Sequence, residues 1–186
     1  MRPDHRPSAA LLVLATALAL AAPARASEVR GLRALALAEA LRHLGRPFGG
    51  DCSGFVIAVW RAAGVSVPLR PARSRSESLQ RASRGTAAPR PGDLAFFHHT
   101  YDRNRDGLAN DPFTHVALVE AADGARVTLL HRSSRGIERV QMDLAHPSDP
   151  RANDPVRALR RGEDPRTRVL AGELFAGFGA FPDGVR

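Results

Sequence analysis

The sequence contains a single cysteine, Cys52, among 186 residues. Because Cys52 has no partner within the chain, an intramolecular disulfide is excluded. A zinc enzyme is disfavoured as well, since one cysteine with two suitably placed histidines makes an incomplete site and no HExxH pattern is present. In an exported protein, a lone cysteine is a buried apolar residue, a link to another chain, or a reactive thiol kept for chemistry.

The chain also has no apolar run long enough to cross a membrane. The run Ala9–Ala22 falls short of the roughly 20 residues that a spanning helix needs. Arginines precede it, and the small-x-small pattern Ala24-Arg25-Ala26 follows it. These features predict a secretory signal peptide at residues 1–26. We therefore expect an exported protein, periplasmic or secreted, with no stable membrane insertion after cleavage.

Lysine is absent, so all 27 basic residues are arginines. Removal of residues 1–26 takes away three arginines and one aspartate, which leaves 24 basic against 18 acidic groups and a net charge of +6. The arginines are scattered along the chain, so we do not expect a nucleic-acid partner. A hydrophobic content of 44% with 25% charged residues is typical of a soluble globular protein.

Helical patterns dominate the first part of the mature chain. Apolar residues between Leu32 and Leu44 predict an amphipathic helix that ends at Gly45. The apolar stretch from Cys52 to Gly64 predicts a second helix, with Cys52 at or just inside its N-terminus. Residues 65–92 are rich in Arg, Ser and Pro and predict a surface connection with a short helix around Ser76–Ala82.

Strand-like runs with turn signals between them follow from Leu94 onward. They are Leu94–Phe97, Val116–Glu120, Val127–His131 and Ile137–Met142. These runs predict an antiparallel meander, and helices followed by strands predict an α+β fold. Residues 145–167 predict a loop with one short helix at Val156–Arg161, and the apolar end, residues 169–181, is expected to pack back on the core.

Two histidines are placed to act with Cys52. A thiolate is favoured by helix N-terminal amides and by a nearby imidazolium. His115 starts one predicted strand and His131 ends the next, and adjacent antiparallel strands put the start of one beside the end of the other. One turn therefore places His115 and His131 side by side, which gives a nucleophile, a base and a group that orients the base.

Four separate blocks resemble the NlpC/P60 family of cysteine peptidases in order and spacing. They are Asp51-Cys52-Ser53-Gly54-Phe55-Val56, Pro91-Gly92-Asp93-Leu94-Ala95-Phe96-Phe97, Thr114-His115-Val116-Ala117-Leu118-Val119 and Leu130-His131. The resemblance covers roughly residues 32–142. It implies a papain-like α+β fold, with N-terminal helices packed on an antiparallel sheet and the nucleophile at a helix N-terminus.

The resemblance also implies an activity, namely cleavage of γ-D-glutamyl to diamino-acid bonds in peptidoglycan stem peptides through a thioacyl-enzyme. It assigns Cys52 as nucleophile, His115 as base and His131 as the third polar residue. Asp51 and Ser53 resemble positions that meet the substrate's free amino end, and both residue types also cap helices well, so both roles remain open. We expect a monomer with one catalytic domain, residues 27–186, that needs no cofactor for catalysis.

Three features depart from the family pattern. Phe48 stands where members often carry a tyrosine, and residues 143–186 form an extension that either lines the cleft or caps the sheet. The third departure is an insertion, residues 98–113, that begins like a calcium loop but lacks its closing glutamate. Its ligands for a structural calcium would be Asp102, Asn104, Asp106 and Asp111, and the alternative is a hydrophilic loop tip.

Two other functions remain possible at this point. An amidase of the CHAP type uses the same Cys and His pair on a similar fold to cut between sugar and peptide. A wall-binding module without activity is the second alternative. The Asp-Cys-Ser-Gly-Phe block and His131 favour the endopeptidase, and retention of both Cys52 and His115 disfavours the binding module.

Overall fold

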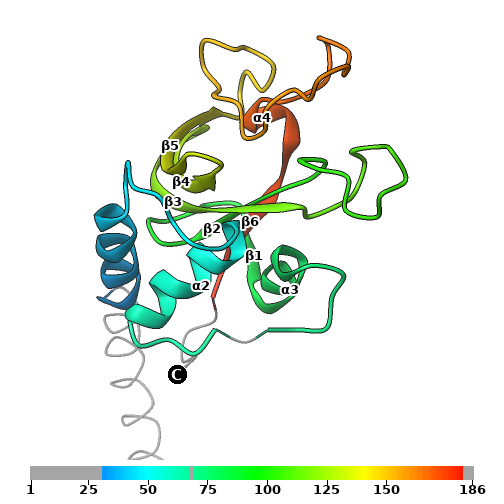
Figure 1. The fold of residues 1–186 in the computed structure, drawn as a ribbon. Helices are drawn as coiled ribbons and strands as arrows, with labels where there is room; N and C mark the ends of the chain where they lie inside the picture. The colour runs from blue at the N-terminus through cyan, green and yellow to red at the C-terminus, as the bar shows by residue number, and fades with distance from the viewer. Residues whose placement is uncertain (1–30, 68, 182–186) are drawn as a thin grey trace, which may run out of the picture.

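The computed structural model describes residues 31–67 and 69–181. The predicted signal peptide, residues 1–26, lies outside these residues. Within the described part of the chain, no helix has both the length and the apolar character required to cross a membrane. Helices come first and pack on one face of an antiparallel sheet, which confirms the α+β class (Figure 1).

Helices at the predicted places carry the first half of the fold. Residues 31–42 are helical, and they are followed by α2 (Cys52–Ala62) and α3 (Arg75–Ala82). The carboxylate of Asp51 caps α2 by accepting from the Gly54 amide at 2.7 Å, and Gly64, with φ at +85°, lies just beyond its end. Cys52 is therefore the first residue of α2, as the sequence predicts.

Six antiparallel strands form one sheet in the order β1-β6-β2-β3-β4-β5. The strands are β1 (Arg84–Thr86), β2 (Leu94–Phe97), β3 (His115–Asp123), β4 (Arg126–Ser133), β5 (Gly136–Asp143) and β6 (Phe175–Ala180). The meander from β2 to β5 agrees with the prediction, and each expected strand is extended by no more than a few residues.

The C-terminal extension is an integral part of this sheet. After the short helix α4 (Ala171–Leu174), β6 pairs with β1 on one side and with β2 on the other. Gly179 in β6 leaves no room for a Cβ, which would overlap Ser83 and the ring of Phe96. The helix predicted at Val156–Arg161 is wrong, because this arginine-rich stretch forms bends, irregular backbone and a turn instead.

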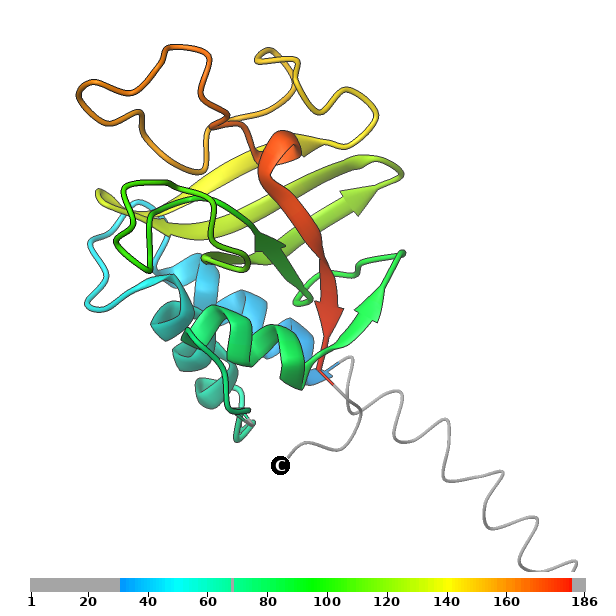
Figure 2. The same cartoon turned by 90° about the vertical axis from the view of Figure 1, so that its right-hand side faces the viewer.

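Two hydrophobic clusters cover the two faces of the sheet. On one face, Phe96 and Leu118 pack against Phe55 and Trp60 of α2. On the other face, Phe97 and Leu129 pack beneath the extension, whose loops and α4 lie on the side opposite to α2 and α3 (Figure 2). Since successive residues of a strand point to opposite faces, burial on both sides explains the unbroken apolar run of β2.

Candidate active site

The thiol of Cys52 lies in the first turn of α2, in contact with α3. Its Sγ is 3.7 Å from Oγ of Ser76, a hydroxyl that is itself buried. Burial raises the pKa of the Cys52 thiol, whereas the Val116 amide and the Ser76 hydroxyl act in the opposite direction. The net shift is upward, so the free enzyme holds a neutral thiol at neutral pH.

His115 and His131 contact each other directly. Nε2 of His115 is 3.1 Å from Nδ1 of His131, and the exposed fractions of the two residues are 8% and 3%. The rings are close to perpendicular, at 79°. The start of β3 thus meets the end of β4, as the sequence predicts for two strands joined by one turn.

Packing of α2 on β3 brings the thiol to the first residues of β3. Phe55 and Val56 of α2 share a core cluster with Val116 and Leu118 of β3. The amide of Val116, the residue after His115, lowers the pKa of the Cys52 thiol. Nε2 of His115 is engaged by His131, so its action on Cys52 would use Nδ1, and this step stays a prediction.

Both histidines are neutral at neutral pH. Burial lowers the pKa of His115 to about 4, and the negative charge of Asp51 opposes this only in part. Burial, followed by the proximity of His115, lowers the pKa of His131 to about 3. A neutral His115 that donates its Nε2–H to Nδ1 of His131 keeps a lone pair on its own Nδ1 and can accept a proton there.

Asp51 and Ser53 organise the beginning of α2. Oγ of Ser53 donates to Asp51 at 2.7 Å, and Nη2 of Arg75 lies 2.8 Å from the other carboxylate oxygen. Burial raises the pKa of Asp51, but hydrogen bonds from Ser53, Gly54 and Arg75 outweigh it and the net pKa falls. The capping role is therefore present in the structure, and contact with a substrate amine stays a prediction.

A cleft of about 500 Å³ opens beside the histidine pair. His115 and His131 line it, together with residues 132–135 after β4 and residues 155–158 of the C-terminal extension. The sequence left open whether this extension lines the cleft or covers the sheet, and the structure shows that it does both. Val156 lines the cleft and also belongs to the hydrophobic cluster beneath the extension.

Tyr101 and Ser76 lie near the thiol, and neither was predicted from the sequence as a site residue. Tyr101, the only tyrosine of the chain, lines the cleft, and its pKa is raised by burial and by the charges of Cys52 and Asp51. Phe48, at the position where the family often has a tyrosine, packs against Phe55 with ring centroids 5.3 Å apart. A lone tyrosine in the insertion was a usable signal, whereas nothing distinguishes Ser76 within a Ser- and Arg-rich segment.

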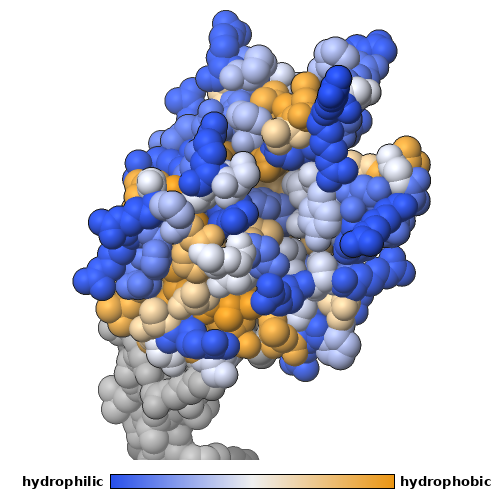
Figure 3. Space-filling model, viewed as in Figure 1, coloured by the Kyte–Doolittle hydropathy of each residue, from blue (hydrophilic) through white to orange (hydrophobic). Residues whose placement is uncertain are grey.

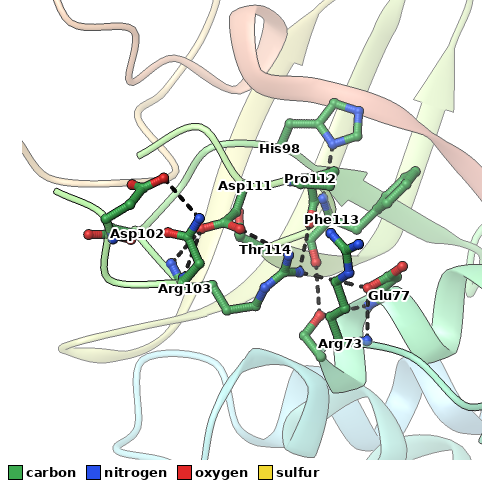
Figure 4. A network of polar contacts seen from close by, with 12 residues as sticks. Arg73, Glu77, His98, Asp102, Arg103, Asp111, Pro112, Phe113 and Thr114 are labelled. Atoms are coloured by element: carbon green, nitrogen blue, oxygen red, sulfur yellow. Dashed lines mark hydrogen bonds and ion pairs between the residues drawn. The ribbon is translucent and has the colours of Figure 1, made fainter. Parts of the chain in front are cut away.

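The insertion places its acidic oxygens in internal hydrogen bonds (Figure 4). Asp102 accepts from the amides of Arg105 and Gly107, at 2.6 and 2.9 Å. Asp106 accepts from Asn104 Nδ2 at 2.9 Å. Residues 31–67 and 69–181 contain no group of three or more His, Cys, Asp or Glu placed to hold a metal. In this arrangement the loop does not form a calcium cage, and calcium binding stays a prediction.

Asp111, the fourth expected calcium ligand, joins the insertion to α3. Its Oδ1 lies 2.9 Å from Nη2 of Arg103, and Nη1 of Arg103 lies 3.7 Å from Glu77 of α3. Oγ of Ser74, the cap of α3, donates to the carbonyl of Phe113 at 3.3 Å (Figure 4). These contacts fix the insertion to the helix that presents Ser76 to the thiol.

Comparison with protein families finds a similarity in this region. Residues 42–133 match the CHAP domain model. CHAP domains are cysteine- and histidine-dependent amidohydrolases and peptidases related to NlpC/P60 enzymes, so the match supports a peptidoglycan hydrolase and does not establish the NlpC/P60 family itself. The CHAP segment includes Cys52, His115 and His131 and ends before α4 and β6. No curated protein matches the chain.

Proposed function

We propose that the protein is an exported cysteine endopeptidase that cleaves the γ-D-glutamyl to diamino-acid bond of peptidoglycan stem peptides. The observation that carries the proposal is the 3.1 Å contact between His115 and His131 at the start of β3, where the N-terminus of α2 presents Cys52. The CHAP match supports the coarser activity, hydrolysis of an amide bond in peptidoglycan.

In the proposed acylation step, Nδ1 of His115 accepts the thiol proton while Sγ of Cys52 attacks the carbonyl carbon of the scissile amide. His131 accepts the Nε2–H of His115 and stabilises the imidazolium that forms. Collapse of the tetrahedral intermediate breaks the C–N bond, and His115 returns the proton to the leaving amine. A thioacyl-enzyme remains on Cys52.

The amides at the start of α2 are the donors for the oxyanion. The Gly54 amide donates to the Asp51 side chain and the Phe55 amide to the Asp51 carbonyl, at 2.7 and 3.0 Å. This leaves the amides of Cys52 and Ser53, at the positive end of the helix dipole, for the developing charge. Water activated by His115 then hydrolyses the thioester and releases the acid product.

Digestion of purified peptidoglycan tests this function. The mature protein, residues 27–186, and its Cys52→Ala variant are incubated with peptidoglycan, and the soluble products are identified by mass spectrometry. Products cut between D-glutamate and the diamino acid, from the wild type alone, support both the bond and the nucleophile. Identical release by both proteins would show that Cys52 is not the nucleophile.

An amidase is the second candidate, because the family match is to the CHAP domain. An amidase cuts between the sugar and the peptide and therefore releases whole stem peptides, whereas the endopeptidase leaves a dipeptide on the glycan. The same digestion separates the two. Absence of any product from either protein, with and without calcium, would favour a wall-binding module or a different amide substrate.

A further inference from the structure

Three arginines line the cleft beside the histidine pair, and they differ in how their charge is balanced. Nε of Arg135 lies 2.7 Å from Glu138, and Arg157 pairs with Glu163. Arg132 makes no side-chain hydrogen bond or ion pair with any residue in the described part of the chain. Its Nε, like that of Arg157, is buried and has no acceptor there, so the difference between the two is that only Arg157 pairs with a carboxylate.

This unbalanced charge has a physical cost that a ligand can relieve. A buried N–H without an acceptor loses its hydrogen bond to water and gains nothing in return. His115 and His131 are neutral at neutral pH, so they do not contribute to the charge of the cleft. Arg132 is partly exposed and lines the same cleft as His115 and His131.

The planar guanidinium fork matches a carboxylate in shape and charge. A γ-linked glutamyl residue keeps a free α-carboxylate close to the bond that the proposed reaction cleaves. The substrate of the proposed function therefore carries an anionic group of the right chemistry near the scissile amide.

We propose that Arg132 forms a carboxylate subsite that binds the α-carboxylate of the glutamyl residue and selects substrates in which this group is not amidated. The inference rests on the proposed function, because it names a substrate group for the same site. Arg132 acts here as a specificity-determining residue and takes no part in proton transfer.

The test compares two synthetic stem peptides that differ only in a free or an amidated α-carboxylate. The wild type is expected to show a kcat/KM about 10- to 100-fold higher for the free carboxylate, the range of one charge-assisted contact. Arg132→Gln is expected to abolish this ratio by slowing only the carboxylate substrate. Arg132→Lys, which keeps the charge without the fork, is expected to retain part of it.

Arg139→Gln is the matched control. Arg139 is an exposed arginine of β5 that pairs with Glu120 at 2.6 Å, and it does not line the cleft. This variant removes the same charge from the protein and is expected to keep the wild-type ratio. Thermal unfolding of each variant verifies that it is folded. If Arg132→Gln is unfolded, the ratio of kcat/KM values measured with Arg132→Lys decides about the subsite.

Failure of the subsite is distinguishable from failure of the proposed function. If the wild type cleaves both peptides equally and Arg132→Gln changes nothing, the subsite is wrong and the peptidase function stands. If neither peptide is cleaved, calorimetric binding of both peptides to Cys52→Ala decides about the subsite. Tighter binding of the carboxylate peptide that is lost with Arg132→Gln supports the subsite, and equal binding overturns it.

Discussion

At the scale of single residues, the site is a neutral thiol beside a neutral pair of histidines. Burial raises the pKa of Cys52 and lowers those of His115 and His131, so each group is held in its uncharged form. In the proposed mechanism, proton transfer from sulfur to Nδ1 of His115 therefore accompanies the attack. An ion pair formed before the substrate binds is not favoured by this environment.

The acid limb of the activity profile follows from this arrangement. His115 loses its ability to accept a proton as the pH falls through its pKa of about 4, so kcat/KM is expected to stay level from neutral pH down to mildly acidic pH and then to decline. Initial rates across the acidic range at constant ionic strength measure this. Samples returned to neutral pH control for unfolding, and an acid limb near the ordinary histidine pKa would contradict the prediction.

Ser76→Ala tests the hydroxyl that contacts Cys52. Its removal takes a hydrogen bond away from the sulfur, so the pKa of the thiol should rise further and kcat/KM should fall by about 3- to 10-fold. The rate of thiol alkylation against pH reports the pKa shift directly. Ser78→Ala, in the same helix, is the control, and an unchanged alkylation profile in Ser76→Ala would show that the contact has no effect.

At the scale of elements, the helices and strands with a regular apolar pattern were predicted from the sequence. The helix that begins at Cys52 and strand β4, which carries His131, could be predicted because apolar residues recur at regular spacing. β1 was missed because Arg84-Gly85-Thr86 has no apolar pattern, and its pairing comes from β6. Ser76 and Tyr101 were missed because long-range folding of α3 and of the insertion brings them near the thiol.

The network at Arg103 predicts a stability effect in the insertion. Arg103→Gln leaves the buried carboxylate of Asp111 without its ion pair and releases the insertion from Glu77, so Tm should fall and proteolysis within residues 98–113 should become faster. Asp111→Asn added to this variant should recover part of the loss. Two fully additive effects in this double-mutant cycle would show that the pair is not coupled.

Calcium binding in the same loop has its own test. If calcium binds, its carboxylate ligands must exchange their internal hydrogen bonds for the ion, and Tm of the wild type should rise with calcium and fall back with a chelator. Asp106→Asn should then remove the response, because Asp106 is exposed and outside the Arg103 network. No response in the wild type would identify the loop as a hydrogen-bonded turn alone.

At the scale of the whole molecule, the segment that matches the CHAP domain is shorter than the folded unit. The CHAP match ends at residue 133, whereas β6 lies within the sheet and residues 155–158 line the cleft. The face seen in Figure 3 carries hydrophobic patches among hydrophilic residues, and the apolar residues of β2 are buried within the two clusters. The cleft and the sheet are therefore built in part from residues well beyond the matched segment.

Truncation tests this dependence. A protein that ends at residue 168 lacks α4 and β6, so β2 loses one of its two neighbours and Phe97 loses its contact with Phe175. We expect loss of cooperative unfolding and of peptidoglycan hydrolysis, measured by circular dichroism and product release. A truncated protein with a wild-type Tm would show that β6 is dispensable. Removal of residues 182–186, which leaves β6 intact, is the control.

The position of β6 also sets when the sheet can be completed. Because β6 follows every other strand in the chain yet lies between β1 and β2, the sheet stays incomplete until residues 175–180 have been translated. A nascent segment that lacks these residues has Cys52 and the histidine pair, but not the strand that joins β1 to the rest of the sheet. The order of strands therefore delays completion of the fold until all six strands are available.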